Sequence, residues 1–335
     1  MVGTGKGAEN GILIKSAESL ETLHLVDTVV LDKTGTITEG KPKVTDIISK
    51  QIITKEELIK IAASLEKNSE HPLAEAIVEI ADETYEPQEF ISVSGRGVKG
   101  NIKGVTYFAG NLAFMKENNI KVEEAKEFLA QGKTVIYIAN ENECIGQIAV
   151  ADTVKETSLK AIKELKNRHL QVVMLTGDNK TVAETIGKQI GIDNIIAEVL
   201  PQDKEKQVSK LQKEGKKVAF VGDGINDSPA ISRADVGIAI GSGTDIAIES
   251  ADIVLMKNSL IDVVSSIDLS KAVIRNIKMN LFWAFFYNCI GIPIACGVLY
   301  PITLNPMIGA LAMSLSSVCV VTNALRLRKF KTQID

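Results

Sequence analysis

The residues best suited to chemistry form the segment Asp-Lys-Thr-Gly-Thr-Ile-Thr, 32–38, directly after the apolar run 29–31. An aspartate that ends a strand presents its carboxylate at the carboxyl edge of a parallel sheet, where open α/β sheets bind ligands. Such a carboxylate can attack a phosphoryl group and become an aspartyl phosphate. Gly35 permits a sharp turn, and the loop hydroxyls and N–H groups can hold phosphate oxygens. The segment therefore predicts a phosphoryl-transfer nucleophile at Asp32.

Two other polar loops also follow apolar runs, and we expect both at the same sheet edge. The loop Thr-Gly-Asp-Asn, 176–179, follows the run 171–175, and Gly-Asp-Gly-Ile-Asn-Asp, 222–227, follows the run 217–221. Phosphoryl transfer depends mostly on positioning and on neutralising charge. Three polar loops that converge on one edge would supply both.

Charged residues in and near these loops indicate how a phosphoryl group would be held. Asp223 is placed to bind Mg²⁺ together with Asp32 and the main-chain carbonyl of Thr34, because Mg²⁺ takes few protein carboxylates plus phosphate oxygens and water. Lys204, in the segment Pro-Gln-Asp-Lys, can reach the phosphoryl oxygens as a point charge.

Alternating helical and strand patterns predict the sheet that positions these loops. An α/β domain with a doubly wound parallel sheet would start with the strand 26–31 and resume after residue 152. From there we expect helices over 154–168, 181–189 and 204–215, and strands over 171–175, 217–221, 236–240 and 253–255.

The middle of the chain has a different pattern, which predicts an α+β domain inserted after the first strand. Helical spacing covers 52–63 and 73–81, and strand patterns cover 91–93, 100–108, 134–139 and 143–150. Near the N-terminus, we expect one helix over 9–25. The predicted divisions are a linker helix at 1–24, the α/β domain at 25–45 and 152–270, the inserted domain at 46–151, and a C-terminal hairpin at 275–326.

The C-terminal hairpin is predicted to cross a membrane. Neither 279–299 nor 300–325 holds a charged residue, and each is about as long as a helix that spans a bilayer. Pro301 and the Asn305-Pro306 step separate the two stretches. Basic residues flank the pair at both ends, which favours two cytoplasmic ends and a multi-pass cell-membrane protein with cytoplasmic catalytic domains. A buried core hairpin is the alternative.

Composition argues against some other classes of protein. The formal net charge is -4, and no basic patch with interleaved aromatic residues occurs, so nucleic acid is not the expected partner. The four cysteines, Cys144, Cys289, Cys296 and Cys319, have no disulfide or zinc spacing, and the last three are expected to be packing residues.

The order of the motifs Asp-Lys-Thr-Gly-Thr, Thr-Gly-Asp-Asn, Pro-x-x-Lys and Gly-Asp-Gly-x-Asn-Asp-x-Pro-Ala resembles the haloacid-dehalogenase-like core of P-type ATPases. The resemblance implies an Mg²⁺-dependent phosphorylation domain in which Asp32 is phosphorylated by ATP. It also implies an ion translocase coupled to ATP hydrolysis. The residues it places at the catalytic site are Asp32, Thr34, Thr176, Gly177, Asp178, Lys204, Asn226 and Asp227.

A set of residues in the inserted domain resembles the nucleotide pocket of the heavy-metal subclass of P-type ATPases. Ser-Glu-His-Pro-Leu, 69–73, follows Glu66, and two glycine-containing segments come later. Each feature alone is weak, since His before Pro and Gly-x-Gly are common at helix starts and turns. The resemblance implies that the domain binds ATP, that Glu66 and His71 orient adenine, and that backbone approaches the nucleotide at Gly95, Gly97, Gly110 and Asn111.

Polar residues inside the hairpin resemble the Tyr-Asn and Met-x-x-Ser-Ser motifs of copper(I)-exporting ATPases. Tyr287, Asn288, Met313 and Ser317 are the implied Cu⁺ ligands, and a thioether suits this soft ion. On the residues alone, packing is the commoner role for Ser and Met in such helices. The absence of Asp, Glu, Lys and His from both stretches disfavours the zinc and cadmium subgroup.

The resemblance reaches only the C-terminal half of such a transporter. The Cys-Pro-Cys helix, the actuator domain with its Thr-Gly-Glu loop and the soluble Cys-x-x-Cys domains have no counterpart here. We therefore expect a missing N-terminal half as partner, and no copper transport by this chain alone. The alternatives are a membrane-anchored phosphatase of the same core, a non-catalytic copper-binding fragment, and a pump for another metal. Such phosphatases carry an acid/base Asp at the position of Thr34.

Overall fold

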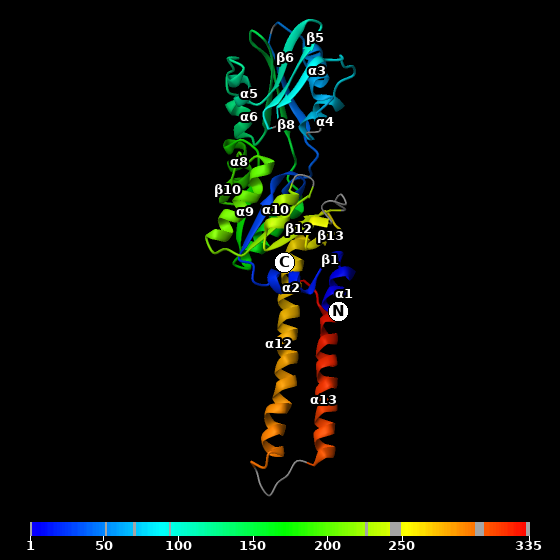
Figure 1. Cartoon of the computed structure of the whole chain (residues 1–335). Helices are drawn as coiled ribbons and strands as arrows, with labels where there is room; N and C mark the ends of the chain where they lie inside the picture. Colours follow the sequence, from blue (N-terminus) through cyan, green and yellow to red (C-terminus); the bar gives the residue numbers. More distant parts are fainter. Residues whose placement is uncertain are drawn as a thin grey trace.

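The computed structural model stacks three parts along one axis: a six-stranded domain, a seven-stranded domain and a pair of long helices (Figure 1). It describes residues 2–50, 52–69, 72–93, 95–224, 227–241, 249–298 and 305–332. The seven-stranded domain lies in the middle, and both other parts are attached to it.

The middle domain is built on a sheet in the order β1-β13-β12-β11-β2-β9-β10. All described pairings in it are parallel except that of β1 with β13. The expected parallel sheet is confirmed, with one antiparallel edge strand added. The strands are β1 Ile12–Ile14, β13 Ile253–Leu255, β12 Val236–Ile240, β11 Val218–Gly222, β2 Thr28–Asp32, β9 Gln171–Leu175 and β10 Asn194–Ile196.

Both faces of this sheet are buried, as continuous apolar runs predict for a parallel sheet. Along β2, Val29 and Leu31 join one hydrophobic cluster while Val30 joins the cluster on the opposite face. The helices of the domain are α7 Glu156–Asn167, α8 Lys180–Ile190, α9 Lys204–Lys213 and α10 Ser228–Arg233, with a short turn at Pro201–Asp203.

The expectation of one helix over 9–25 is wrong. The segment instead contains α1 Val2–Glu9, strand β1 and α2 Ala17–Leu23. Gly11 takes a left-handed backbone (φ 79°), which ends the first helix, and Ser16 caps the second by accepting the Ser19 N–H at 3.1 Å.

The six-stranded domain is inserted between β2 and β9 and is antiparallel, in the order β3-β8-β7-β6-β5-β4. The predicted division put this domain at 46–151, whereas β3 starts at Lys43 and so crosses the predicted boundary at 46. The strands are β3 Lys43–Ser49, β4 Gln88–Val93, β5 Gly97–Ile102, β6 Val105–Gly110, β7 Thr134–Asn140 and β8 Cys144–Ala151. The helices are α3 Lys55–Glu66, α4 Pro72–Glu79, α5 Leu112–Glu117 and α6 Lys126–Ala130.

The run 100–108, predicted as one strand, is a hairpin of β5 and β6. Lys103 and Gly104 both have positive φ, 54° and 83°, as a two-residue hairpin turn with matching twist requires. Asn101 accepts the Gly104 N–H at 2.9 Å and stabilises the turn.

Two long helices extend from the middle domain. Helix α12, Ile261–Ala295, is buried at its start, where Val263, Val264 and Ile267 pack in the core, and carries exposed apolar side chains beyond residue 276. Gly297 is left-handed after its end. Helix α13, Pro306–Leu325, begins at the predicted Asn-Pro step, with Asn305 accepting the Met307 N–H, and is followed by one turn at Arg326–Lys329. Pro301 lies outside the described residues.

The part of the chain that the structure describes contains one helical stretch, Gly309–Lys329, with the length and hydropathy of a membrane span. The exposed part of α12 also contains Trp, Tyr and Asn residues. At the domain end of the pair, Asn276 donates to the Asn323 carbonyl at 2.7 Å and Asn323 donates to Asn280 Oδ1 at 2.8 Å. These bonds fix α12 against α13.

Candidate active site

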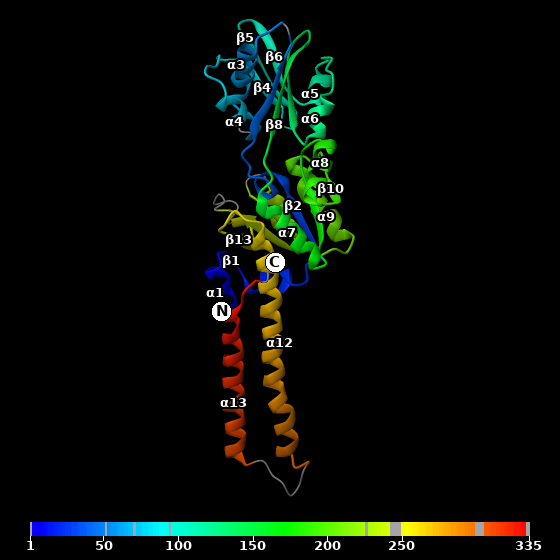
Figure 2. The ribbon, with the colours of Figure 1, turned by 180° about the vertical axis from the view of Figure 1, so that it is seen from behind.

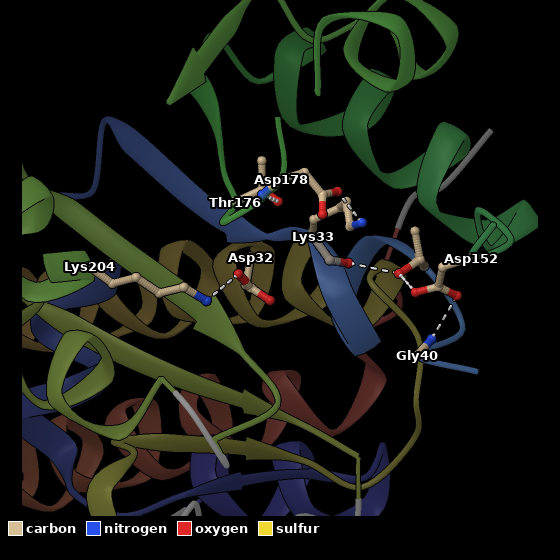
Figure 3. A network of polar contacts seen from close by, with 8 residues as sticks. Asp32, Lys33, Gly40, Asp152, Thr176, Asp178 and Lys204 are labelled. Carbon is tan, nitrogen blue, oxygen red and sulfur yellow. Dashed lines mark hydrogen bonds and ion pairs between the residues drawn. The ribbon is translucent and has the colours of Figure 1, made fainter. Parts of the chain in front are cut away.

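Asp32 lies where strand β2 ends, and only 4% of its surface is exposed. The buried strand places this carboxylate at the carboxyl edge of the sheet, beside the ends of β9 and β11. The predicted convergence of three loops is thus found at one edge. Figure 3 shows Lys204 reaching toward Asp32 from one side while Lys33 and Asp178 meet on the other.

Lys204 connects two buried carboxylates. Its ammonium donates to Asp32 Oδ1 and to Asp227 Oδ1, each at 2.6 Å, and its side chain is 10% exposed. Lys204 is the first residue of α9, so the short turn at Pro201–Asp203 delivers it to the site. Charged groups this deeply buried must be paired.

Burial raises the pKa of Asp32, and repulsion from Asp227 adds to the rise, while Lys204 opposes it. Burial also raises the pKa of Asp227. For Lys204, burial alone would lower the pKa, but attraction to the two carboxylates outweighs burial and raises it. The lysine therefore stays charged and supplies the positive charge that a phosphoryl group at Asp32 would meet.

A second ion pair joins the Asp32 loop to the loop after β9. Lys33, which is 6% exposed, bonds Asp178, and the Asp178 N–H is held by Thr176 Oγ1 at 3.1 Å. Burial favours the neutral amine, but attraction to Asp178 prevails and raises the pKa of Lys33. Thr176 is buried and Gly177 is exposed. The loop therefore offers the site a hydroxyl group at Thr176 and accessible backbone at Gly177.

The turn Lys33–Ile37, directly after Asp32, lies next to Asp223. Gly35 has a left-handed backbone (φ 72°), and a Cβ atom there would lie 3.1 Å from Asp223 Oδ2. Thr36 is fully buried, and its hydroxyl has no hydrogen-bond partner among the described residues. Thr34 is half-buried in the same turn. Within the described residues no cluster of three or more His, Cys, Asp or Glu side chains forms a metal site.

The predicted nucleotide residues occupy one end of the inserted domain. Glu66 ends α3 and is 7% exposed, and burial raises its pKa to about 7, against the opposing effect of a hydrogen bond with Ser69. Asn111 donates to the Gly95 carbonyl at 3.0 Å. A Cβ atom on Gly97 would lie 2.6 Å from Gly110 Cα, so neither position admits a side chain. His71 lies outside the described residues, as does Asn226.

The predicted copper ligands do not form one site in this structure. Tyr287 contacts Cys319 of α13 at 3.8 Å, whereas Asn288 lines an open hollow of α12 and donates to the Ala284 carbonyl. Met313 is 71% exposed, and Ser317 donates to the Met313 carbonyl of its own helix. Among the described residues, no hydrogen bond joins the α12 pair to the α13 pair.

Sequence reasoning missed three buried or half-buried charged residues around the loop. They are Lys33, Asp152 and Lys155. Asp152 accepts from the Thr38 hydroxyl and from the Gly40 N–H, and so joins the segment that enters the inserted domain to the segment that leaves it. Asp152 lies next to residue 151, the predicted end of the inserted domain. A charged residue where the chain passes from one domain to the next was the feature of the sequence that could have indicated its role.

A known family matches the middle domain together with the domain inserted in it. A haloacid dehalogenase-like hydrolase family profile matches residues 26–235. A copper-exporting P-type ATPase of Staphylococcus saprophyticus is 50% identical over 99% of this chain and 42% of its own length. A probable copper-importing P-type ATPase A of Enterococcus hirae is 49% identical over 98% of this chain and 45% of its own length. The chain thus spans less than half the length of these relatives.

Solved structures with the same architecture include metal-transporting ATPases. A zinc-transporting PIB-type ATPase in the E2.Pi state matches with a TM-score of 0.69 and 36% identity, over 98% of this chain and 54% of that one. The catalytic domain of a CPx-ATPase, CopB-B, studied for its conformational changes upon nucleotide binding, matches with a TM-score of 0.64 and 30% identity. That match covers 79% of this chain and 97% of the domain.

Proposed function

Because the chain belongs to the haloacid dehalogenase-like hydrolases and, within them, to the P-type ATPases, we propose that it is the part of a copper(I) pump that binds ATP and accepts its γ-phosphate at Asp32. The observation that carries this proposal is the buried Asp32 at the edge of the sheet, 2.6 Å from Lys204 and flanked by the loops of Asp178 and Asp223. A surface turn would not bury this many charges around one carboxylate.

The proposed reaction moves one phosphoryl group. An Asp32 carboxylate oxygen attacks the γ-phosphorus of ATP in line, the new O–P bond forms, the bond to the β-phosphate oxygen breaks, and ADP leaves with its electron pair. Lys204 then balances charge on the phosphoryl oxygens, and Lys33 holds Asp178 and its loop in place. Thr34 stands where a phosphatase would carry its acid, which favours a long-lived phosphoaspartate.

Two features of the site fit an Mg²⁺ ion. Asp223 lies beside Gly35 of the nucleophile loop, and Asp32 supplies a second carboxylate, a sufficient set because Mg²⁺ keeps water and phosphate oxygens as its other ligands. The Thr36 hydroxyl, buried without a described partner, provides an unused polar group in the same loop. Asp32, Asp223 and the Thr34 carbonyl are the proposed ligands, and the bound ion would neutralise phosphate charge.

ATP is proposed to lie between the two domains, with its base at Glu66 and His71. The backbone packs closely at Gly97 against Gly110, and the Asn111 side chain donates to the Gly95 carbonyl, so these segments are held together in the domain where ATP is proposed to bind. The buried Glu66 carboxyl, with its raised pKa, can donate or accept a hydrogen bond near neutral pH.

Copper(I) is the proposed ion, with Tyr287, Asn288, Met313 and Ser317 as part of its site. The support is the thioether and the absence of charged residues between 279 and 325, together with the names of the bacterial relatives. Export is the proposed direction, by likeness to the staphylococcal relatives, whereas the enterococcal relative carries the opposite name. Both helices of the hairpin are proposed to cross the cell membrane, with the catalytic domains in the cytoplasm.

Acid-stable labelling from γ-labelled ATP with Mg²⁺ tests the catalytic part of the proposal. We expect a hydroxylamine-sensitive label on the intact chain, and none on Asp32→Asn. Lys206→Met is the matched control, because Lys206 lies on the same helix as Lys204 with its side chain 77% exposed. A chain that binds ATP but takes up no label would contradict the proposal.

A further inference from the structure

Lys155 is a buried lysine whose two partners lie far from it in the sequence. It precedes helix α7, is 3% exposed, and donates to the Gly35 carbonyl and to Asn258 Oδ1, each at 2.6 Å. A buried ammonium is costly unless its donors are satisfied, so this lysine binds firmly to both acceptors. One acceptor belongs to the nucleophile loop, and the other precedes Ile261, the first residue of α12.

The attachment of α7 to the nucleophile loop has more than one contact. The Lys155 N–H donates to the Ile37 carbonyl at 3.0 Å, and the Ser158 hydroxyl donates to the same oxygen at 2.8 Å. Gly35, whose carbonyl Lys155 binds, lies directly against Asp223. Any displacement of the loop at Gly35 therefore acts on the Lys155 ammonium and on the first turn of α7.

Helix α7 is also bonded to α12 at its C-terminal end, opposite the end where Lys155 lies. Arg168, just after α7, donates to both carboxylate oxygens of Asp268 in α12, at 2.8 and 2.7 Å. Between the two ends, Ile162 and Leu165 of α7 belong to the same core cluster as Val263 and other residues of α12. Figure 2 shows α7 beside the sheet, above the exposed length of α12. The start of α12 is thus fixed to α7 as one unit.

We propose that Lys155 is a positioning residue that transmits the state of the nucleophile loop to the start of α12. The proposal rests on the proposed phosphorylation of Asp32, since phosphorylation is what would change the loop. The physical link is one side chain with two hydrogen bonds, one to the loop and one to the residue that leads into α12. Coupling between two sites requires an element whose equilibrium both sites bias, and Lys155 is in a position to be that element because it contacts both.

Amide hydrogen exchange of the full chain in detergent, with and without beryllofluoride and Mg²⁺, tests this link. Beryllofluoride imitates the phosphoryl group on an aspartate. In the unmodified chain we expect slower exchange in the loop 33–38 and a change in exchange at 259–266. In Lys155→Met we expect the loop protection to remain and the change at 259–266 to be lost.

Two other variants separate coupling from folding. Asn258 is exposed, so Asn258→Ala leaves the core intact and should lose the response at 259–266, whereas Asn258→Asp keeps an acceptor and should retain it. Lys163→Met, on the exposed side of α7, is the matched control and should retain both responses. If Lys155→Met does not fold, the Asn258 pair decides the question by the same criterion.

The failures of the two proposals give different results. A response at 259–266 that survives in folded Lys155→Met, or in Asn258→Ala, overturns the coupling proposal. Loop protection without any response at 259–266 in the unmodified chain overturns coupling and leaves phosphorylation standing. No loop protection in the unmodified chain overturns the proposed phosphorylation, and the coupling proposal with it.

Discussion

The two regions with a proposed function differ in how their polar groups are satisfied. Around Asp32, charged side chains are buried and bonded to partners from distant parts of the chain, such as Lys204 and Asp178. In the helical hairpin, Asn288 and Ser317 bond carbonyls of their own helices, and Met313 is exposed. A site whose side chains already hold one another in place is preorganised, whereas the proposed copper ligands are not held toward any common point.

This contrast gives different expectations for substitutions in the two regions. Among the described residues, ion pairs of Lys204 and Lys33 hold the loops around Asp32 together, whereas no such contact links the proposed copper ligands. We therefore expect substitutions of the residues around Asp32 to change stability and phosphorylation strongly, and substitutions in the hairpin to change neither.

The largest effect should come from Lys204→Met. Removing the ammonium leaves Asp32 and Asp227 buried side by side without a cation, which should cost about 3–5 kcal/mol in unfolding free energy and abolish labelling. Urea unfolding measures the loss, and adding Asp227→Asn should recover part of it. A loss no greater than that of Lys206→Met would contradict the view that this cluster is tightly preorganised.

The second effect concerns Glu66 and depends on pH. Because burial raises its pKa from 4.5 to about 7, ionised Glu66 destabilises the folded state, and the penalty develops as pH rises through this range. Glu66→Gln should therefore be more stable than the unmodified chain by about 3 kcal/mol above pH 7, with no difference below pH 4.5. Urea unfolding at several pH values measures this, and a difference independent of pH would exclude the explanation.

A smaller effect is expected for Gly35→Ala. An alanine at a left-handed backbone costs about 1–2 kcal/mol, and its Cβ would press on Asp223 at 3.1 Å. In this variant, phosphate labelling should decrease together with the free energy of unfolding. Gly215→Ala has the same type of backbone, with no atom near its Cβ, so it should lose stability but keep the label. Equal labelling of both variants would show that the contact with Asp223 is unimportant.

The smallest effect is expected in the hairpin. Met313→Leu with Ser317→Ala should change unfolding free energy by less than about 0.5 kcal/mol, because neither side chain contacts the folded domains. Labelling should equal that of the unmodified chain. A clear decrease in labelling from these two substitutions would contradict the contrast between the two regions, because it would show that the hairpin acts on Asp32 in this chain.

Strands with buried apolar runs could be predicted at their correct bounds, such as 171–175 and 236–240, because both faces of a parallel strand are buried. Strand β3 could not, since its residues alternate between exposed and half-buried at a sheet edge. The helix expected over 9–25 failed where Gly11 turns the chain.

The loops at the sheet edge are local motifs, so Asp32, Asp178 and Asp223 could be predicted from sequence to lie near one another. Lys155 could not, because its role depends on Gly35 and Asn258, which lie 120 and 103 residues away. The arrangement of the proposed copper ligands also could not be predicted, since helical spacing does not determine how α12 and α13 face each other. Tyr287 lies toward α13, and Asn288 does not.

The insertion of one domain within another has a consequence for how the chain folds as it is synthesised. The inserted sheet is made from the continuous stretch 43–151, so all its strand pairings are available before the rest is made. Strand β2 must wait for its neighbours β9 and β11, which begin at Gln171 and Val218. The strand that ends in Asp32 therefore stays without its neighbours in the sheet while the inserted domain after it can already fold.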